Sequence, residues 1–414
     1  MILFFYSCIS CIIFYSLFVL FKYLKFFKII SKKFDDKLDD DKGLFISIPC
    51  LREQNVIEET VKYFRKICDL PIVIVTTQKE EYEYKYNKLK LTTKTFVENN
   101  ILNKYDNIFL IDCPSINGYM ADNLNYMLEQ LKKLPFYDNS KEWYMSLYNA
   151  DSKPSKNSFN AIFYEINRDK KVMQQYSYCF NNFKRLSLIM KGFAIYQSNF
   201  EIKVGLFNSI FKTRFLYHYV VGHGLTVNLN ALKKLGGFNT EFWCEDIYLT
   251  MNLKFNNIQI TPIYELECID NAVSISQLIK QNSVWYNTTR KYRLIYKDLK
   301  NKLNNFSLNG FVGCLNEFKC AINWLLLPVV FLFIFLSSIL YKSIILAVLI
   351  TISFCFYSFI NYYITIKTIN KLSSKNYSIE LYNWIAYSIA LLISNIGPIY
   401  SFFSNNNIKY KTER

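Results

Sequence analysis

Long apolar runs lie at both ends of the chain, and a mixed section separates them. Ile2–Phe21 is almost wholly apolar and has about the 20 residues that a helix needs to cross a bilayer. Apolar character returns at Ala321–Leu340 and Ser343–Ile364, which are each long enough to span, and more weakly at Trp384–Phe403. Because polar and helix-breaking residues near Asn395 interrupt the last run, a re-entrant segment is the alternative there. The pattern predicts one membrane span before the mixed section and about three after it.

The first apolar run has two interpretations, a retained anchor or a cleaved signal peptide. A signal peptide begins with basic residues, has a shorter apolar run and ends at a small-residue cleavage site. This run has none of these features, so we expect a retained anchor. Lysines follow it, and lysines also follow Ser343–Ile364. Because positive residues collect on the cytoplasmic side of spans, we expect a multi-pass protein of the cell membrane whose middle section is cytoplasmic.

The middle section alternates between short β-type runs and helical runs. The β-type runs are rich in Ile and Val or are apolar and aromatic: Leu44–Pro49, Pro71–Thr77, Asn107–Asp112 and Trp143–Asn149. Helical patterns at Glu53–Lys66 and Tyr119–Lys132 lie between them. This alternation predicts an α/β fold with a parallel sheet and right-handed crossovers. Ligands bind beyond the carboxyl ends of such strands, so the loops that follow these four runs are the expected site.

The predicted organisation has six parts. These are an anchor (1–30), a polar linker (31–42), a cytoplasmic catalytic domain (43–272), amphipathic interface helices (273–318), C-terminal transmembrane helices (319–404) and a polar tail (405–414).

Composition narrows the range of partners. The chain has 49 Lys and Arg against 33 Asp and Glu, a formal net charge of +16. Many of the basic residues flank apolar runs, which favours a membrane surface, and no pattern typical of nucleic-acid recognition is present. The eleven cysteines are scattered and odd in number, which argues against a disulfide framework.

Three acidic residues are candidates for chemistry. Asp151 follows the fourth β-type run, where a carboxylate could hold a divalent cation against phosphates; a simple turn at Asn149–Asp151 is the alternative. Glu245 and Asp246 precede a helical run, Ile247–Phe255, where Asp246 could act as a general base or only as a helix cap.

Other candidates would line a binding site. Gln281 and Trp285 are four residues apart on one helix face, so Trp285 could stack on a sugar ring or anchor the helix at the membrane surface. His223, between two glycines, could line the site or be structural.

Several segments together resemble the membrane-bound family-2 glycosyltransferases, which include cellulose, chitin and hyaluronan synthases and ceramide glucosyltransferase. They follow the family's order: Ser47–Glu53, Ala121–Leu128, Tyr148–Asp151, Gly222–Gly224 with Leu235–Phe238, Glu245–Asp246, and Gln281–Trp285. The resemblance implies a nucleotide-sugar-binding, Rossmann-like domain of GT-A type with flanking transmembrane helices. It also implies inverting transfer from a UDP-sugar, with Mg2+ or Mn2+, to a lipid-linked or growing glycan acceptor.

The resemblance assigns roles to individual residues. Glu53 belongs to the nucleotide-binding turn, Asn149 and Asp151 stand at the DxD position, and Asp246 with Glu245 forms the acid pair that carries the base. The chain departs from the family's pattern at Thr77, Met120, Asn149 and Val284, and Val284 replaces the arginine of QxxRW. The departures motivate an alternative, a non-catalytic relative that binds nucleotide-sugar or assists a glycan synthase.

Overall fold

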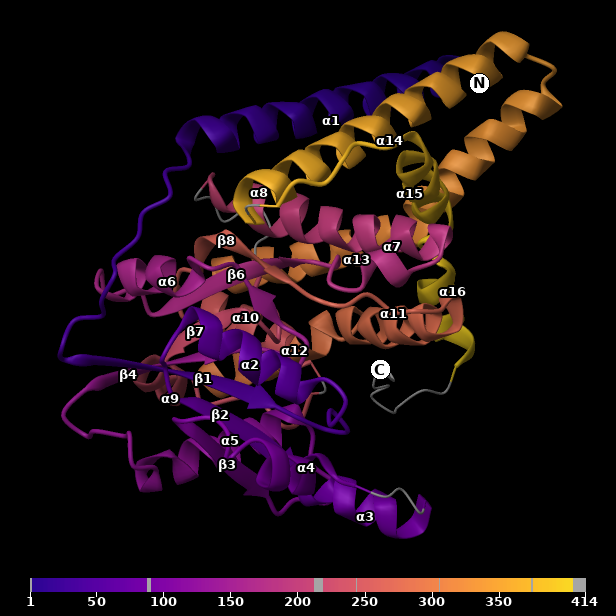
Figure 1. Cartoon of the computed structure of the whole chain (residues 1–414). Coiled ribbons are helices and arrows are strands. Elements are labelled where there is room, and N and C mark those ends of the chain that lie inside the picture. The colour runs from indigo at the N-terminus through magenta and orange to yellow at the C-terminus, as the bar shows by residue number, and fades with distance from the viewer. Residues whose placement is uncertain are drawn as a thin grey trace.

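An eight-stranded mixed sheet forms the centre of the middle section (Figure 1). Its order is β3-β2-β1-β4-β7-β6-β8-β5. The strands are β1 (Lys42–Pro49), β2 (Ile72–Thr77), β3 (Ile108–Cys113), β4 (Glu142–Leu147), β5 (Lys153–Pro154), β6 (Val172–Tyr178), β7 (Leu225–Asn228) and β8 (Thr261–Cys268). The computed structural model describes residues 2–87, 91–211, 219–242, 244–304, 306–373 and 375–404, so the expected polar tail lies outside the described residues.

The first half of the sheet is parallel, and its four strands coincide with the predicted runs. β1 pairs in parallel with β2 on one side and with β4 on the other, and β2 pairs in parallel with β3. Phe45, Ile46 and Ile48 of β1 are completely buried, as expected for a parallel strand that is covered on both faces.

The second half departs from the predicted all-parallel sheet. β7 pairs antiparallel with both β4 and β6, and β6 pairs in parallel with β8. β7 has only four residues, so its sequence carries little strand periodicity. Since Leu225 is opposite Leu147, the start of β7 lies at the carboxyl end of β4. The carboxyl ends of β4, β6 and β8 therefore share one edge with the residues that precede β7.

Helices cover both faces of the sheet. Leu44 and Ile46 pack with Phe64 of α2 (Ile57–Ile67), whereas Phe45 packs with Leu124 of α5 (Met120–Gln130) on the opposite face. This alternation follows from the two-residue side-chain period of a strand. The other helices of this part are α3 (Gln78–Asn87), α4 (Thr93–Asn100), η1 (Leu131–Lys133), α6 (Ser158–Ile166), η2 (Phe183–Arg185), α9 (Leu229–Lys234) and α10 (Glu245–Phe255).

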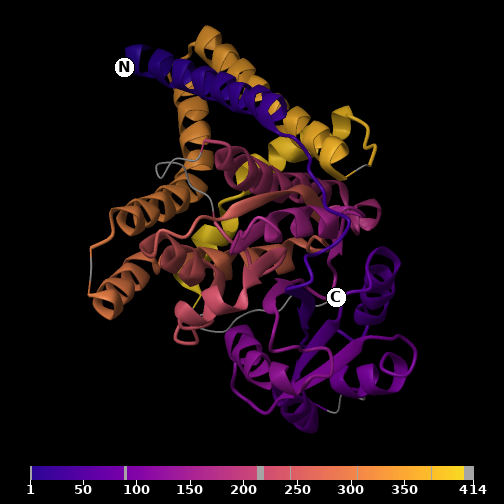
Figure 2. The same cartoon turned by 90° about the vertical axis from the view of Figure 1, so that its left-hand side faces the viewer.

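Among the described residues, four helical segments are long and apolar enough to cross a membrane, which indicates a membrane protein. They are Tyr6–Ile29, Leu308–Leu340, Ile344–Ser373 and Leu381–Phe403. These segments belong to α1 (Ile2–Ile29), α13 (Leu308–Leu340), α14 (Ile344–Ser373), and α15 (Leu381–Ile393) with α16 (Ile396–Phe403). α1 packs along α14, and both views show them on the opposite side of the molecule from β1–β3 (Figures 1 and 2).

The last segment is broken where the sequence predicted an interruption. Between α15 and α16, the Ser394 carbonyl accepts a hydrogen bond from Trp324 Nε1 at 3.0 Å, and Asn395 Nδ2 donates to the Leu325 carbonyl at 3.1 Å. α13 thus provides partners for polar groups of the break, as an apolar environment requires.

A helical excursion joins the sheet to the membrane helices, and the sequence patterns did not predict it. It consists of α7 (Leu188–Phe200), the π-helical turn η3 (Glu201–Leu206) and α8 (Phe207–Ser209). α7 lies so close to α15 that a Cβ on Gly192 would be 2.2 Å from the Ala386 carbonyl oxygen. α11 (Ile275–Thr289) packs against α16 in a similar way, since a Cβ on Gly397 would be 2.4 Å from the Asn282 Cβ. α12 (Tyr292–Leu303) follows α11.

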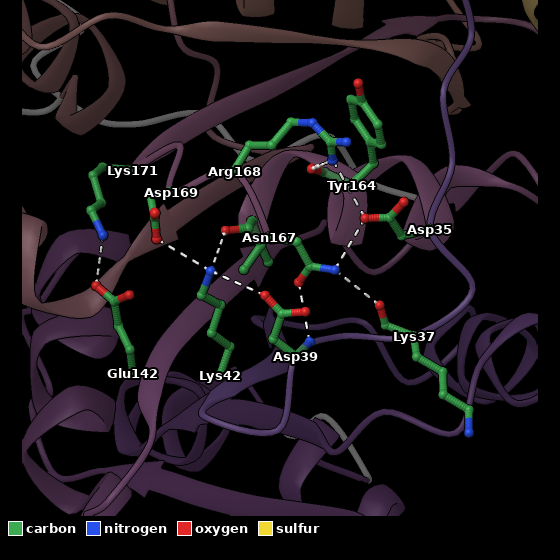
Figure 3. Close-up of polar contacts among 11 residues, drawn as sticks. Asp35, Lys37, Asp39, Lys42, Glu142, Tyr164, Asn167, Arg168, Asp169 and Lys171 are labelled. Carbon is green, nitrogen blue, oxygen red and sulfur yellow. Dashed lines mark hydrogen bonds and ion pairs between the residues drawn. The ribbon is translucent and has the colours of Figure 1, made fainter.

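The polar linker after α1 is docked along the sheet domain (Figure 3). The Asp35 amide donates to the Asn160 carbonyl at 3.1 Å, and Asn167 Nδ2 donates to the Asp35 carboxylate at 3.1 Å. At the end of the linker, Lys42 forms an ion pair with Asp169 at 3.2 Å. These contacts hold the linker against α6 and the turn that follows it.

Candidate active site

The loop after β1 is held by a buried acid from the next strand–helix unit. Arg52 has a φ of 57°, and its amide donates to Glu80 Oε2 at 2.9 Å. Glu80 Oε1 accepts from the Thr93 amide at 2.8 Å, and Thr93 Oγ1 in turn accepts from the Glu53 amide at 2.8 Å. Glu53, predicted in the nucleotide-binding turn, is buried in this network. Sequence reasoning missed Glu80, because it is one acid of several in a polar run.

The ends of β2 and β3 are tied together by a hydroxyl, a carboxylate and an ammonium group. Thr76 Oγ1 donates to Asp112 Oδ1 at 2.8 Å, and Lys94 forms an ion pair with Asp112 Oδ2 at 3.0 Å. Thr77, one of the departures from the family pattern, donates to the Ser115 carbonyl at 2.9 Å. The acidic side chain at the carboxyl ends of β2 and β3 is therefore that of Asp112 in β3, which sequence reasoning did not single out.

Asp151 lies beyond the carboxyl end of β4 and reaches the end of β8. Its Oδ2 accepts from the Asp270 amide at 3.0 Å, and the side chain is almost completely buried. The Asn149 amide donates to Ser152 Oγ at 2.9 Å, so Asn149–Ser152 is a turn in the structure. Thr60 of α2 also donates to the Ala150 carbonyl. The turn therefore directs the Asp151 carboxylate inward and fixes it there.

His223 is paired with a fully buried glutamate of β8. His223 Nδ1 lies 3.1 Å from Glu267 Oε2, and the His223 side chain is 13% exposed. Burial disfavours the imidazolium, but the charge and hydrogen bond of Glu267, with the charges of Glu201 and Asp151, raise the pKa of His223 to about 9. The imidazolium form of His223 is therefore favoured by Glu267, which is in contact with the ring, and by Glu201 and Asp151, which act over a longer distance.

Glu201 and Glu267 both act electrostatically on His223, and the sequence reasoning did not predict either of them. Burial raises the pKa of Glu201 to about 7, and its Oε1 accepts from the Tyr219 hydroxyl at 3.1 Å. Glu267 Oε1 is buried and has no hydrogen-bond partner among the described residues. A signal for Glu267 was present, because an acid inside a buried strand needs a partner or a function. Glu201 carried no such signal, since its helical excursion was not predicted.

Of the two glycines around His223, Gly224 is required by its backbone conformation and by close packing, whereas a Cβ on Gly222 would make only ordinary van der Waals contacts. Gly224 has a φ of 62°, and a Cβ there would lie 2.3 Å from the Gln175 carbonyl oxygen and 2.8 Å from Glu267 Oε2. Gln174 of β6 accepts from the Val221 amide at 3.0 Å and donates to the His223 carbonyl at 2.8 Å. The segment is thereby held across the edge of the sheet.

Glu245 and Asp246, the predicted acid pair, lie on the other side of the segment that carries His223. A Cβ on Gly222 would be 3.7 Å from Glu245 Oε1, and 3.9 Å from the methyl group of Met120. Glu245 is buried and Asp246 is half-buried. The helix begins at Glu245 with Cys244 as its cap, so Asp246 is the second helical residue and not the cap that the sequence pattern suggested. Asp246 Oδ1 accepts a hydrogen bond from the next amide, Ile247, at 2.8 Å.

The helix that carries Gln281 and Trp285 is α11. Trp285 is 45% exposed, whereas Val284, which the sequence resemblance aligns with the arginine of QxxRW, is buried. Gln281 is half-buried. Since α11 packs against the membrane helix α16 through Asn282, both interpretations of Trp285, sugar stacking and surface anchoring, are compatible with its position.

A divalent cation could bind at this edge of the sheet only if a bound substrate supplied further oxygen atoms to it. Among the described residues, no three His, Cys, Asp or Glu side chains come together as a preformed metal site. Mg2+ commonly binds through one or two carboxylates and completes its shell with water and substrate phosphates. Asp151, buried and aligned by Asp270, is suited to such a site.

No family model and no curated protein matches the chain. Among solved structures, the chain is similar to a mannosyltransferase from Pyrobaculum calidifontis in complex with GDP-Man and Mn2+, with 13% identity and a TM-score of 0.48. The likeness covers 97% of this chain and 99% of that one. At this identity and score it does not bear on function, which has to be inferred from the residues themselves.

Proposed function

We propose that this chain is a membrane-embedded glycosyltransferase of GT-A type. It transfers a sugar with inversion from a nucleotide-sugar, a UDP-sugar in our proposal, to a lipid-linked or growing glycan acceptor. One observation carries the proposal: Asp151, the His223–Glu267 pair and Glu245 come from four distant segments and meet along one edge of the sheet. This is the edge at which α/β sheets bind their ligands.

Asp151 would hold the divalent cation, Mg2+ or Mn2+, that neutralises the donor diphosphate. Its burial and its fixed orientation favour this role, because a ligand that needs no rearrangement binds at lower cost. His223 would supply a second positive charge near the diphosphate, which matters here because the family's arginine is replaced by Val284. Glu53 and Asn149 would line the donor side, and Gln281 and Trp285 the sugar or acceptor side.

The acid pair would act on the acceptor. A neutral sugar hydroxyl is a weak nucleophile, and a positioned base that takes its proton accelerates transfer by about 10²–10⁴-fold. Asp246 is half-buried at the start of α10, and Glu245 is buried beside Gly222. We assign the base to Asp246, because its greater exposure leaves it accessible to an acceptor.

The membrane helices support an acceptor at the membrane. The lysines that follow α1 favour a cytoplasmic sheet domain. Since the described part of the chain has four candidate spans, we favour lipid glycosylation or short-chain synthesis over export of a long polymer.

One observation favours a non-catalytic relative as the second candidate. Val284 is buried at the family's arginine position, so a cationic group is missing there. Nucleotide release separates the two candidates. Purified protein should release UDP, or another nucleoside diphosphate, from one donor of a nucleotide-sugar panel when a divalent cation and a lipid extract are present. If it binds a donor but releases nothing from any member of the panel, the non-catalytic function holds.

A further inference from the structure

Three lysines from three different elements lie together where the membrane helices meet the sheet domain. They are Lys22 of α1, Lys203 of η3 and Lys319 of α13. Lys22 Nζ lies 3.4 Å from the Lys203 carbonyl oxygen, and the charges of both Lys203 and Lys319 reach Lys22. Figure 1 shows the corresponding end of α1 beside α8 and α14.

The hydrogen-bond partners of Lys22 and Lys203 are neutral. Lys22 donates to Asn208 Oδ1 at 2.5 Å, and Lys203 donates to Asn361 Oδ1 at 3.4 Å. Lys203 also lies between two aromatic rings, 5.7 Å from Tyr15 and 5.8 Å from Tyr357. Within the described part of the chain, none of the three lysines forms an ion pair with a carboxylate.

Three like charges at such proximity repel one another, and burial adds to the cost, since Lys22 is 6% exposed. An anion that binds between them would remove much of this repulsion. Lys203 is half-buried and Lys319 is exposed, so the cluster is accessible from outside.

The depth of the cluster corresponds to a lipid headgroup. Lys22 directly follows Ile2–Phe21, the apolar run of α1. Lys319 directly precedes the apolar stretch of α13 that begins at Ala321. Both residues therefore lie near the polar end of a span, where phosphate groups of lipids are found.

The cluster is also close to the proposed catalytic edge. Lys203 is two residues from Glu201, which accepts from Tyr219 at the start of the segment that leads to His223. Cys320, next to Lys319, lies within electrostatic reach of both Lys203 and Lys254. Lys254 belongs to α10, so the acid pair at the start of that helix is about 14 Å away along its axis.

We propose that Lys22, Lys203 and Lys319 bind the phosphate group of a lipid acceptor at the membrane surface. This inference rests on the proposed function for its biological meaning and specifies the acceptor as a phosphate-bearing lipid. The lipid chains would extend along the membrane helices, and the headgroup would point towards Glu245 and Asp246.

Binding of a short-chain phosphatidic acid to the purified full-length protein, followed by native mass spectrometry in detergent, tests the site. The double variant Lys203→Gln/Lys319→Gln removes two charges and leaves the buried Lys22 in place. Its affinity should fall by about 10- to 30-fold, since a lysine near an anionic lipid headgroup typically contributes several-fold in affinity. Lys28→Gln is the matched control, because Lys28 is an exposed lysine of α1 outside the cluster, and its affinity should be unchanged.

Two further probes identify the source of the phosphate. Diacylglycerol with the same chains should not compete, and inorganic phosphate should compete only at much higher concentration. Equal binding by the double variant and the parent would overturn the site, and competition by inorganic phosphate at the same concentration as the lipid would overturn a lipid ligand. UDP binding is measured on the same preparations. Equal lipid binding by the double variant and the parent, with normal UDP binding, contradicts this inference alone. The expected fall in lipid binding of the double variant, without nucleotide binding by the parent protein, contradicts the proposed function alone.

Discussion

The His223–Glu267 pair gives a prediction whose size follows from the structure. The ordinary pKa of histidine is 6.5, and the pKa of His223 is raised to about 9, since the effect of Glu267 and the other carboxyl groups exceeds that of burial. At about 1.4 kcal/mol per pKa unit, this difference corresponds to roughly 3 kcal/mol of stability in the protonated state.

The direction of the pH effect follows from the sign of the shift. A group whose pKa is higher in the folded than in the unfolded protein stabilises the fold fully below its unfolded pKa. For His223, this contribution should be complete below pH 6.5 and should disappear as the pH rises through about 9. In Glu267→Gln the main partner is gone while burial remains, so the pKa of His223 should fall well below its value in the parent protein. The loss of stability between pH 6.5 and about 9 should then be much smaller.

The assay uses the small number of histidines. The chain has only two, His218 and His223, so 13C-labelled histidine gives two NMR signals, and a His218→Gln variant assigns them. Glu265→Gln is the control, since Glu265 is a buried acid of the same strand that pairs with Lys32; there the midpoint of His223 should stay near 9. A midpoint at or below 6.5 in the parent protein would refute the electrostatic account of this site.

Three other predictions concern the donor site, the membrane contact and the topology. Asp151→Ala should weaken UDP binding and its dependence on Mg2+ or Mn2+ while the fold survives; unchanged affinity and metal response would leave Asp151 as a turn residue only. Gly192→Val should lower the stability by about 1–3 kcal/mol, because its side chain would collide with the Ala386 carbonyl, whereas Leu188→Ala, at an exposed position of the same helix, should change the melting temperature little. Protease outside sealed cells should leave residues 91–211 intact and should cleave them after permeabilisation; cleavage in sealed cells would contradict a cytoplasmic sheet domain.

Local patterns predicted the parallel half of the sheet and the membrane helices because each of these has a strong sequence period or length signal. β1 to β4 are apolar runs followed by turns, and α14 is a long apolar helix. The antiparallel strand β7 was missed, because four residues between Gly224 and α9 carry too little pattern. The helical excursion α7–η3–α8 was missed for a different reason: α7 is held by its contact with α15, which is distant in the sequence.

The candidate site shows the same difference between residues marked by a local sequence pattern and residues brought in by tertiary contacts. Asp151 and Glu245 were identifiable because they follow or precede a regular element, and His223 because two glycines surround it. Glu267 and Glu201 become part of the site only when β8 and η3 are brought next to His223. The sequence motifs therefore predicted residues that begin or end elements, and missed those that take part only through tertiary contacts.

Asp246→Asn tests most directly whether this chain is a transferase with a general base at the start of α10. Asn has nearly the same size, and its side-chain carbonyl oxygen can accept the same hydrogen bond from the Ile247 amide, so folding should be preserved. Sugar transfer and UDP binding are measured on one preparation, with Glu241→Gln as a control, since Glu241 is an exposed acid close to the same helix. The account predicts normal UDP binding with transfer reduced by about 10²–10⁴-fold in Asp246→Asn and little change in Glu241→Gln. Turnover of Asp246→Asn within a few-fold of the parent protein would contradict it and would make Glu245 the next candidate for the base.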